Sequence, residues 1–317
     1  MGEMQEIKKA AEIIRKGGLV AFPTETVYGL GADALNPHAV ARIFEVKNRP
    51  RFDPIIVHVA NFSEVERLWS HVDERAEKLM EKFWPGPLTL ALPKSDIVPD
   101  IVTAGLSTVA IRMPSHPVAL SLIKEAQTPI AAPSANPFGY LSPTSAEHVK
   151  EQLGNKIELI LDGGRCPVGV ESTVISLAEK KPLLLRPGGV ALEEIENIVG
   201  KVEIAHHASA RPQSPGQLSR HYSPRTPIEI LTGKGEREGK KVGLLVFTPP
   251  ASRQGDYEVV EVLSSEGDLV EAAANLFLCL HRLDRKGLDV IYAEPVPEVG
   301  LGRAIMDRLR KAAGTLD

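Results

Sequence analysis

The rest of the chain is organised around Gly17-Gly18-Leu19-Val20-Ala21-Phe22-Pro23-Thr24-Glu25-Thr26-Val27-Tyr28-Gly29-Leu30-Gly31. Its apolar run from Leu19 to Phe22 is typical of a short buried strand. A proline then ends the strand, and three hydroxyl side chains follow it, from Thr24, Thr26 and Tyr28. Gly29 and Gly31 allow tight turns and a close approach of the backbone to a ligand. The stretch therefore predicts a strand followed by a polar loop.

A helix and a basic cluster come next. Asn36-Pro37 supplies an N-cap and a first helical residue, which predicts a helix from Pro37 to about Val46. Directly after it, Lys47-Asn48-Arg49-Pro50-Arg51 carries three cations within five residues. This arrangement indicates an anion site. The alternative is that Lys47 and Arg49 only complement the helix dipole at its C-terminus, and these residues alone do not decide between the two.

Composition narrows the class of protein. A chain of 317 residues exceeds the usual size of a single domain, so two domains are expected. The formal net charge of -4 argues against broad binding to nucleic acid. No apolar run is long enough to span a membrane, and the first residues lack a signal-peptide core, so a cytoplasmic protein without membrane contact is expected. Two distant cysteines, Cys166 and Cys279, make a disulfide framework or a zinc site improbable.

Short apolar runs alternate with helical patterns along the first two-thirds of the chain, which predicts an α/β or α+β domain. Strands are expected at 54–59, 88–92, 108–113, 130–132, 157–161, 170–177 and 183–185. Thr144-x-x-Glu147 has the form of a capping box that opens a helix to Leu153. Residues 208–224 are rich in proline, glycine and serine and read as a linker. Beyond them, strands and helices alternate again, which gives domains at 1–207 and 225–317.

Motifs for the common nucleotide and hydrolase sites are absent from the sequence: it has no Walker A pattern, dinucleotide fingerprint, Gly-x-Ser-x-Gly or His-Glu-x-x-His. Polar residues instead stand at strand ends. Arg112 closes one strand and is suited to clamp a carboxylate or phosphate, although most arginines simply reach solvent. Ser134 and Asn136 follow another strand, where a plain turn is the alternative. His58 lies within a strand, where a structural histidine is the alternative.

Together these motifs resemble the YrdC-type threonylcarbamoyl-AMP synthase family. The resemblance is carried by Pro23 to Leu30, Lys47-x-Arg49, Trp84-Pro85-Gly86-Pro87, Ala131 to Asn136, Gly169 to Thr173 and Leu185 to Gly188. It continues through Ser214 to Leu218 and His221 to Pro224, which resemble the linker of two-domain members, and Gly300 to Leu309, which resembles the end of their second domain. The resemblance implies a curved, mixed α/β sheet with a concave basic face, joined to a smaller Rossmann-like α/β domain.

The activity implied by the resemblance is an adenylyl transfer. Members of the family join L-threonine, hydrogencarbonate and ATP into threonylcarbamoyl-AMP and diphosphate, for the threonylcarbamoyladenosine modification of tRNA. Mg²⁺ is the expected cofactor, and the product is expected to pass to a tRNA threonylcarbamoyl-transfer complex. Stable binding of nucleic acid is not expected. Because the substrate's own carbamate attacks the phosphorus, the chain needs no nucleophile, and catalysis should rest on positioning and charge neutralisation.

Site roles carry over by resemblance, one position at a time. Lys47 and Arg49 are the expected catalytic cations. The expected ATP-binding residues are Lys47, Arg49, Asp53, Thr108, Ser134, Asn136, Ser142, Arg186 and Tyr222. The expected threonine-binding residues are Thr26, Tyr28, His58, Arg112 and Ser172, with Tyr28 on the pocket floor. Relatives often have asparagine where this chain has Asp53, which puts an acidic group beside the phosphates.

Two rival functions share this fold. One is an RNA-binding module, and the other is the carbamoyl-transfer module of hydrogenase maturation, which should carry zinc-finger cysteine pairs that this chain lacks. The linker bears on the choice. Linkers of two-domain relatives fold over the nucleotide site, so residues 214–224 are expected to act as a lid that excludes water from labile intermediates, with Tyr222 as the contact group. From composition alone, a plain spacer is the alternative.

Overall fold

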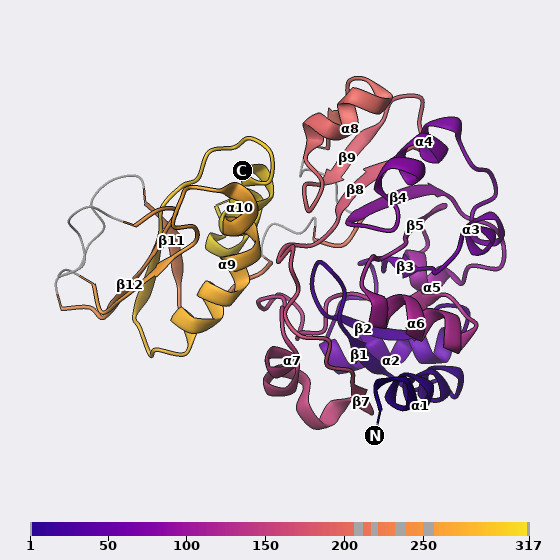
Figure 1. Cartoon of the computed structure of the whole chain (residues 1–317), viewed down its shortest axis with the longest axis horizontal. Helices are drawn as coiled ribbons and strands as arrows, with labels where there is room; N and C mark the ends of the chain where they lie inside the picture. The colour runs from indigo at the N-terminus through magenta and orange to yellow at the C-terminus, as the bar shows by residue number, and fades with distance from the viewer. Residues whose placement is uncertain (1, 206–211, 217–220, 232–238, 250–256, 316–317) are drawn as a thin grey trace.

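The computed structural model describes residues 2–205, 212–216, 221–231, 239–249 and 257–315. The described strands form two separate sheets, one of ten strands and one of four. We call residues 2–205 the larger part and residues 225–315 the smaller part, and Figure 1 shows them side by side. Among the described helices, none is both long enough and apolar enough to cross a membrane.

The larger part is a mixed sheet with strand order β10-β9-β8-β4-β5-β3-β6-β2-β1-β7. Parallel and antiparallel pairs alternate irregularly along it, as in the parallel pair β4–β8 and the antiparallel pair β4–β5. The strands are β1 (Val20–Phe22), β2 (Gly29–Asp33), β3 (Val57–His58), β4 (Leu88–Pro93), β5 (Thr108–Arg112), β6 (Ile130–Ala131), β7 (Leu159–Ile160), β8 (Thr173–Ser176), β9 (Leu183–Arg186) and β10 (Glu203–Ile204). The mixed α/β sheet that the sequence predicts is confirmed.

The stretch that opens the sequence analysis forms a hairpin. Its predicted strand is β1, and it pairs antiparallel with β2, with Phe22 opposite Gly29. The sequence does not predict β2, because glycines weaken a strand. A β-carbon on Gly31 would lie 2.8 Å from both Ile130 and the Phe22 ring, so this glycine serves close packing within the sheet and not a tight turn. The six-residue loop between the two strands carries the polar side chains of the stretch.

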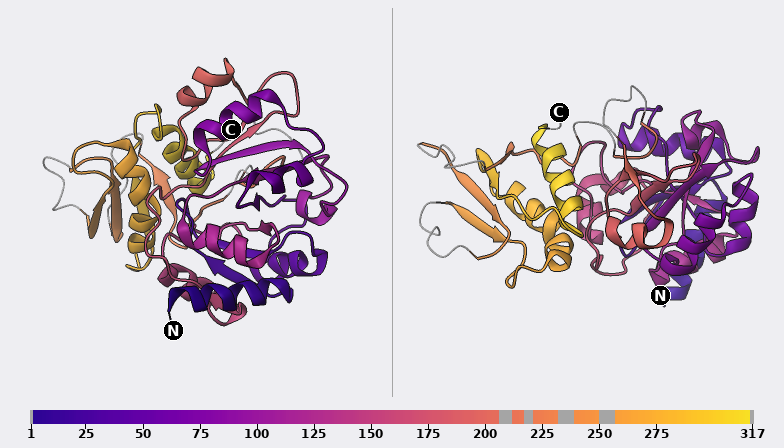
Figure 2. Two further views of the ribbon diagram at one scale, coloured as in Figure 1. Left: turned by 45° about the vertical axis from the view of Figure 1, so that its right-hand side comes forward. Right: turned by 90° about the horizontal axis from the view of Figure 1, so that it is seen from above.

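Helices cover the sheet of the larger part (Figures 1 and 2), and the residues that they bury are mainly apolar. The predicted helix α2 (Pro37–Lys47) begins as expected, since the Asn36 side chain accepts hydrogen bonds from two backbone N–H groups of its first turn. The others are α1 (Glu3–Arg15), α3 (Phe62–Leu68), α4 (Glu74–Phe83), α5 (Asp100–Thr103), α6 (Pro117–Ala126), α7 (Ala146–Leu153) with the 3₁₀ turn Gly154–Lys156, and α8 (Leu192–Val199). The capping box at α7 is misplaced by one residue, because Ser145 and not Thr144 caps the helix.

The smaller part is an all-parallel sheet of order β11-β14-β12-β13. Its strands are β11 (Ile228–Ile230), β12 (Val242–Val246), β13 (Val259–Val262) and β14 (Val290–Ala293). The described helices of this part are α9 (Leu269–Asp284) and α10 (Gly302–Ala313). A parallel sheet with crossover helices agrees with the predicted Rossmann-like arrangement.

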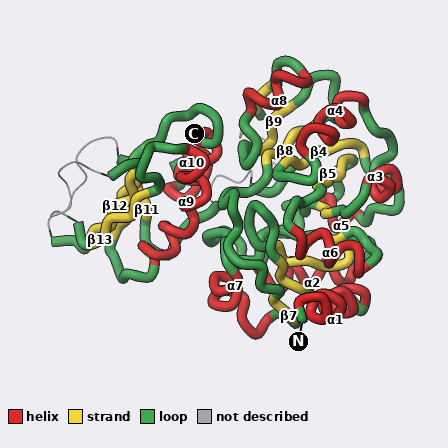
Figure 3. The backbone as a smooth tube through the Cα atoms, viewed as in Figure 1, coloured by secondary structure: helices red, strands yellow, loops and turns green. Residues whose placement is uncertain are grey.

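Helices α9 and α10 lie between the small sheet and the larger part (Figure 2). The side of the larger part that faces them consists largely of loops (Figure 3). Two imidazoles stack across this boundary, His148 of α7 and His281 of α9, with ring centroids 3.9 Å apart. Tyr140 also donates a hydrogen bond to Asp284 over 2.5 Å. The two parts are therefore joined by specific side-chain contacts.

Candidate active site

One cavity gathers polar side chains from the larger part and from the described linker residues. The side chains of the larger part come from the loops after β1, α2 and β6, from β3, from the ends of β5 and β9, and from the two residues before β8. The predicted site residues on its wall are Thr26, Arg49, His58, Arg112, Ser134, Ser172, Arg186 and Tyr222. Three arginines thus line a single cavity, which suits a ligand with several negative charges.

Arg112 ends β5 and is only 3% exposed. Its guanidinium lies 2.7 Å from the Glu25 carboxylate and donates to the Thr26 hydroxyl over 2.8 Å. Both partners belong to the loop of the β1–β2 hairpin, so the loop and the strand end fix each other. The structure therefore excludes the alternative of an arginine that simply reaches solvent.

Lys47 and Arg49 lie at the C-terminal end of α2, and both are buried. The Lys47 ammonium donates to the backbone carbonyls of Ser134, over 2.6 Å, and of Asn136. Burial, with the nearby charge of Arg49, lowers the pKa of Lys47 well below its ordinary value. Arg49 forms an ion pair of 2.9 Å with Asp53. These contacts go beyond a helix-dipole role, because Lys47 ties α2 to the loop after β6 and Arg49 pairs with a buried carboxylate.

Arg186 ends β9 and contacts oxygens of neutral groups. It donates to the Ser172 carbonyl over 2.9 Å, to the Ser172 hydroxyl over 3.1 Å and to the Pro215 carbonyl over 3.2 Å. Within the described ranges no carboxylate forms an ion pair with it, in contrast to Arg49 and Arg112. Its charge therefore remains available to an anionic ligand.

His58 lies on β3 and is 4% exposed. Its ring meets Phe22 edge-on, with centroids 6.1 Å apart. Burial and the charge of Arg112 lower the pKa of His58 to about 3. The imidazole is therefore neutral at physiological pH, so it can accept or donate a hydrogen bond in the cavity without adding charge.

The remaining predicted residues lie off the wall of this cavity. Lys47 and Asn136 are behind Ser134, and Asp53 is fully buried behind Arg49. Ser142 donates to the Glu171 carboxylate over 2.5 Å. Tyr28, expected on the pocket floor, is not among the residues that line this cavity. Its hydroxyl donates instead to the Gly164 carbonyl over 2.7 Å.

Thr108 lines a second cavity, with Ser176 and Gln213. It stands at the start of β5, whereas Arg112 ends that strand, so the two are about 13 Å apart at the usual rise per residue. Thr108 and Arg112 still face the same side of the sheet, because even-spaced residues of a strand share a face. A small apolar cluster that includes Ala110 and Leu185 lies near both cavities on this face.

Several residues on the wall of the cavity were not predicted as site residues from the sequence. Glu171 lies on the wall beside Ser172, and Gly216 and His221 bring the linker to the cavity. Burial is the largest cause that lowers the pKa of His221 well below its ordinary value, so this imidazole is neutral too. Glu171 and Gly216 stand within the motifs that carry the family resemblance, but a glutamate before a strand and a glycine after a proline have common structural uses.

Neither a metal centre nor a thiol nucleophile is evident in the part of the chain that the structure describes. It contains no group of three or more His, Cys, Asp or Glu side chains placed to hold a metal ion. Both cysteines are buried, and burial raises the pKa of Cys166 and of Cys279 to about 12. A protonated thiol is a poor nucleophile.

Comparison with known proteins identifies the family. Residues 12–188 match the Sua5/YciO/YrdC family model, which is described as telomere recombination. The chain belongs to the Sua5/YciO/YrdC family. Residues 190–314 match the model of the threonylcarbamoyl-AMP synthase C-terminal domain. The chain thus combines the Sua5/YciO/YrdC domain with this second domain, as the resemblance in the sequence predicts.

Full-length relatives of the Sua5/YciO/YrdC family are similar to this chain. The threonylcarbamoyl-AMP synthase of Pyrococcus abyssi is 50% identical over 330 residues, covering 98% of this chain and 95% of the relative. That of Bacillus subtilis is 47% identical, covering 98% of this chain and 93% of the relative. A crystal structure of Pyrococcus abyssi Sua5 complexed with L-threonine is 49% identical, with a TM-score of 0.92 over 98% of this chain and 95% of that one.

Proposed function

We infer that this chain is a threonylcarbamoyl-AMP synthase, which makes threonylcarbamoyl-AMP and diphosphate from L-threonine, hydrogencarbonate and ATP. Sequence identity of 47–50% over nearly the full length of relatives with that name is the observation that carries the inference. The geometry supports it, because cations and hydroxyl groups gather in one cavity without a thiol nucleophile.

The reaction needs no covalent bond to the protein. The threonine amine first combines with hydrogencarbonate to give a carbamate and water. One carbamate oxygen then attacks the α-phosphorus of ATP while the bond to the β-phosphate oxygen breaks, and diphosphate leaves with that electron pair. The developing charge is on phosphate oxygens, so preorganised cations supply most of the acceleration.

The phosphate end of the site is proposed to lie between α2 and the linker. Arg49, Arg186 and Ser134 are on the cavity wall and present donors to it. Lys47 uses two of its three N–H donors on the carbonyls of the loop after β6, which leaves one for a phosphate oxygen. Asp53 is proposed to orient Arg49 and not to contact ATP, because it is fully buried behind that arginine.

The threonine end is proposed to lie at Arg112. Its guanidinium is held by Glu25 and Thr26 in a fixed position, suited to a carboxylate. Neutral His58 is on the same wall and can accept a hydrogen bond from the substrate amine or hydroxyl. The threonine methyl group would contact apolar wall residues such as Val27 and Ala132.

The adenosine is proposed to extend along the same face of the sheet towards Thr108. Strands β5 and β9 line both cavities. The first cavity has Arg112 of β5 and Arg186 of β9 on its wall, and the second has Thr108 of β5 and Leu185 of β9. With the adenosine in this direction, the phosphates lie at Arg186 and the base lies near the apolar cluster of Ala110 and Leu185. In this position Thr108 contacts the outer end of the nucleotide.

We propose that Mg²⁺ arrives with ATP and is held mainly by the phosphates. Magnesium commonly binds through one or two carboxylates plus substrate phosphates. The carboxylates of Asp53 and Glu171 already pair with arginines, and the described residues offer no cluster for a resident ion. The donor set therefore fits an ion that enters on the nucleotide. When bound, the ion would neutralise part of the phosphate charge.

Diphosphate release by the purified protein is expected to require L-threonine, hydrogencarbonate and ATP together. Omission of any one should leave only background release, measured with a coupled diphosphate assay. Serine should support weak turnover, because one methyl group in an apolar pocket is worth about 1–3 kcal/mol. RNA binding without three-substrate turnover would favour the RNA-binding alternative. Turnover with serine equal to that with threonine would contradict the assigned threonine site.

The linker is proposed to close over the cavity with Gly216 and Tyr222. Gly216 has a φ of +82°, and a β-carbon on it would lie 2.4 Å from the Tyr222 hydroxyl. Gly216→Ala should therefore displace Tyr222 and open the site, which exposes the labile carbamate and mixed anhydride to water. We expect a lower yield of threonylcarbamoyl-AMP and more free AMP, separated by chromatography.

Gly200→Ala is the matched control for this substitution. Gly200 has a φ of +77°, but no atom lies within 4 Å of its would-be β-carbon. It should cost stability without leakage of AMP. Equal AMP leakage from both variants would show that backbone strain, and not displacement of Tyr222, is the cause, and the linker would then be a spacer.

The product is proposed to pass to a tRNA threonylcarbamoyl-transfer complex. Threonylcarbamoyl-AMP is a mixed anhydride that hydrolyses in water, so a hand-over soon after release preserves it. When an acceptor complex and tRNA are added to the assay, AMP should be released by transfer of the threonylcarbamoyl group to tRNA and no longer by hydrolysis. Modified tRNA would be the readout.

A further inference from the structure

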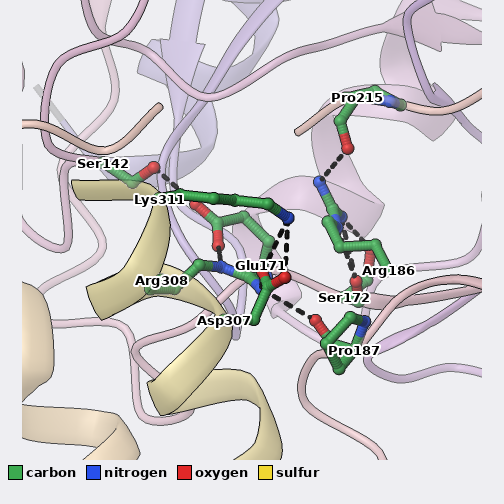
Figure 4. A network of polar contacts seen from close by, with 9 residues as sticks. All are labelled: Ser142, Glu171, Ser172, Arg186, Pro187, Pro215, Asp307, Arg308 and Lys311. Carbon is green, nitrogen blue, oxygen red and sulfur yellow. Dashed lines mark hydrogen bonds and ion pairs between the residues drawn. The ribbon is translucent and has the colours of Figure 1, made fainter. Parts of the chain in front are cut away.

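Helix α10 of the smaller part brings three charged side chains into the boundary with the larger part. Asp307, Arg308 and Lys311 are 7%, 0% and 0% exposed. Their spacing places them on one face of the helix. Buried charges are costly unless they are paired. Figure 4 shows that they are paired with one another and with the larger part. Lys311 lies 2.7 Å from the Asp307 carboxylate.

Arg308 connects this helix to the wall of the cavity. Its Nε lies 2.8 Å from an oxygen of Glu171, and one Nη donates to the Pro187 carbonyl over 2.9 Å (Figure 4). Its guanidinium carbon is 5.0 Å from the ring centroid of Tyr222. The other oxygen of Glu171 accepts the hydrogen bond of Ser142. Arg308 is therefore one residue removed from the cavity at two points, Glu171 and Tyr222.

Glu171 is an unexpected charge in this cavity. The other charged side chains on the wall of the cavity are Arg49, Arg112 and Arg186, and the proposed ligands are anions. Burial alone would raise the pKa of Glu171, but the charges of Arg308 and Arg186 more than offset burial and hold the pKa below its ordinary value. The carboxylate is therefore ionised, and without a partner it would repel a triphosphate. Arg308 is the cation that forms an ion pair with it.

We propose that Arg308 is a positioning residue of the ATP site: it neutralises and orients Glu171, so that the smaller part completes the charge balance of a cavity formed by the larger part. The proposal rests on the proposed function for the identity of the ligand. It assigns the second domain a role in nucleotide binding that acts through the ion pair of Arg308 with Glu171.

The test is a charge-rescue experiment. Arg308→Met should weaken equilibrium binding of ATP, measured by calorimetry without threonine, by at least tenfold, and raise the KM for ATP by a similar factor. The KM for threonine should change less than threefold. Adding Glu171→Gln to Arg308→Met should return ATP binding to within threefold of the unsubstituted protein, because the repelling charge is gone. A purely structural role of Arg308 would not be rescued in this way.

Arg303→Met is the control on the same helix. Arg303 forms an ion pair of 2.9 Å with Glu193 of the larger part, and neither residue lines the cavity. Both KM values should remain unchanged. If Arg308→Met does not fold, Glu171→Gln alone decides: it should bind ATP at least as tightly as the unsubstituted protein, and weaker binding overturns the proposal.

The outcomes separate this proposal from the proposed function. If the unsubstituted protein binds no ATP, the proposed function fails. If it binds ATP and Arg308→Met binds equally well, only the role of Arg308 is overturned. Weak binding by Arg308→Met without rescue by Glu171→Gln also overturns it, because the loss would then come from packing and not from the charge of Glu171.

Discussion

Replacing Lys47 with methionine is expected to slow diphosphate release at saturating substrates by about 100- to 1,000-fold, the usual effect of removing one preorganised donor to developing charge. Lys47 is 1% exposed, at the end of α2, and its ammonium donates to the carbonyls of Ser134 and Asn136. Methionine keeps most of the side-chain volume but removes the charge and all three donors. The variant should therefore lose the cation that we propose for diphosphate, and it should lose the anchor of the loop after β6.

Lys124→Met is the matched control for Lys47→Met. Lys124 also lies in the last turn of a helix, α6, but it is exposed. A contribution to the helix dipole is worth about 0.3–1 kcal/mol at either position. If Lys47 served only the dipole, both variants would show a similar small loss in thermal stability and a normal kcat. Single-turnover rates with saturating ATP and threonine distinguish these outcomes.

The regular elements could be predicted because they follow local rules. The helix after Asn36 begins at an N-cap followed by proline, and the structure places both in these positions. The parallel strands of the smaller part are apolar runs such as Val242–Val246, which is buried throughout. Strand β2 could not be predicted, because Gly29 and Gly31 have low strand propensity. It exists because the Phe22 ring packs where their side chains would be.

The site could be predicted in part. Arg49, Arg112 and Arg186 each stand at or just after the end of a helix or strand, and the family resemblance is what assigned them to one site. The ion pairs at the site that join residues far apart in the sequence could not be predicted in the same way. Glu25 meets Arg112 from 87 residues away in the sequence, and Arg308 meets Glu171 from 137 residues away. On α10, Arg308 is one of several charges that would read as a solvated helix face.

Arg112→Ala is expected to raise the KM for threonine by roughly 10- to 150-fold, the factor that corresponds to a charge-assisted hydrogen bond of about 1.5–3 kcal/mol. The KM for ATP should change less than threefold. The substitution also leaves Glu25 as a buried carboxylate without its partner, which costs stability. The double variant Arg112→Ala/Glu25→Gln removes that charge. It should recover thermal stability, while the KM for threonine stays high because the guanidinium is still missing.

Two substrate analogues make the role of Arg112 specific to the carboxylate. Serine keeps the carboxylate and lacks the methyl group, so the ratio of threonine to serine turnover should be the same in the parent protein and in Arg112→Ala. Threonine amide lacks the carboxylate, so the parent protein should discriminate strongly against it and Arg112→Ala should not. If Arg112→Ala raised the KM for ATP and for threonine equally, Arg112 would act on the cavity as a whole. The separation of the threonine end from the phosphate end at Arg49 and Arg186 would then be wrong.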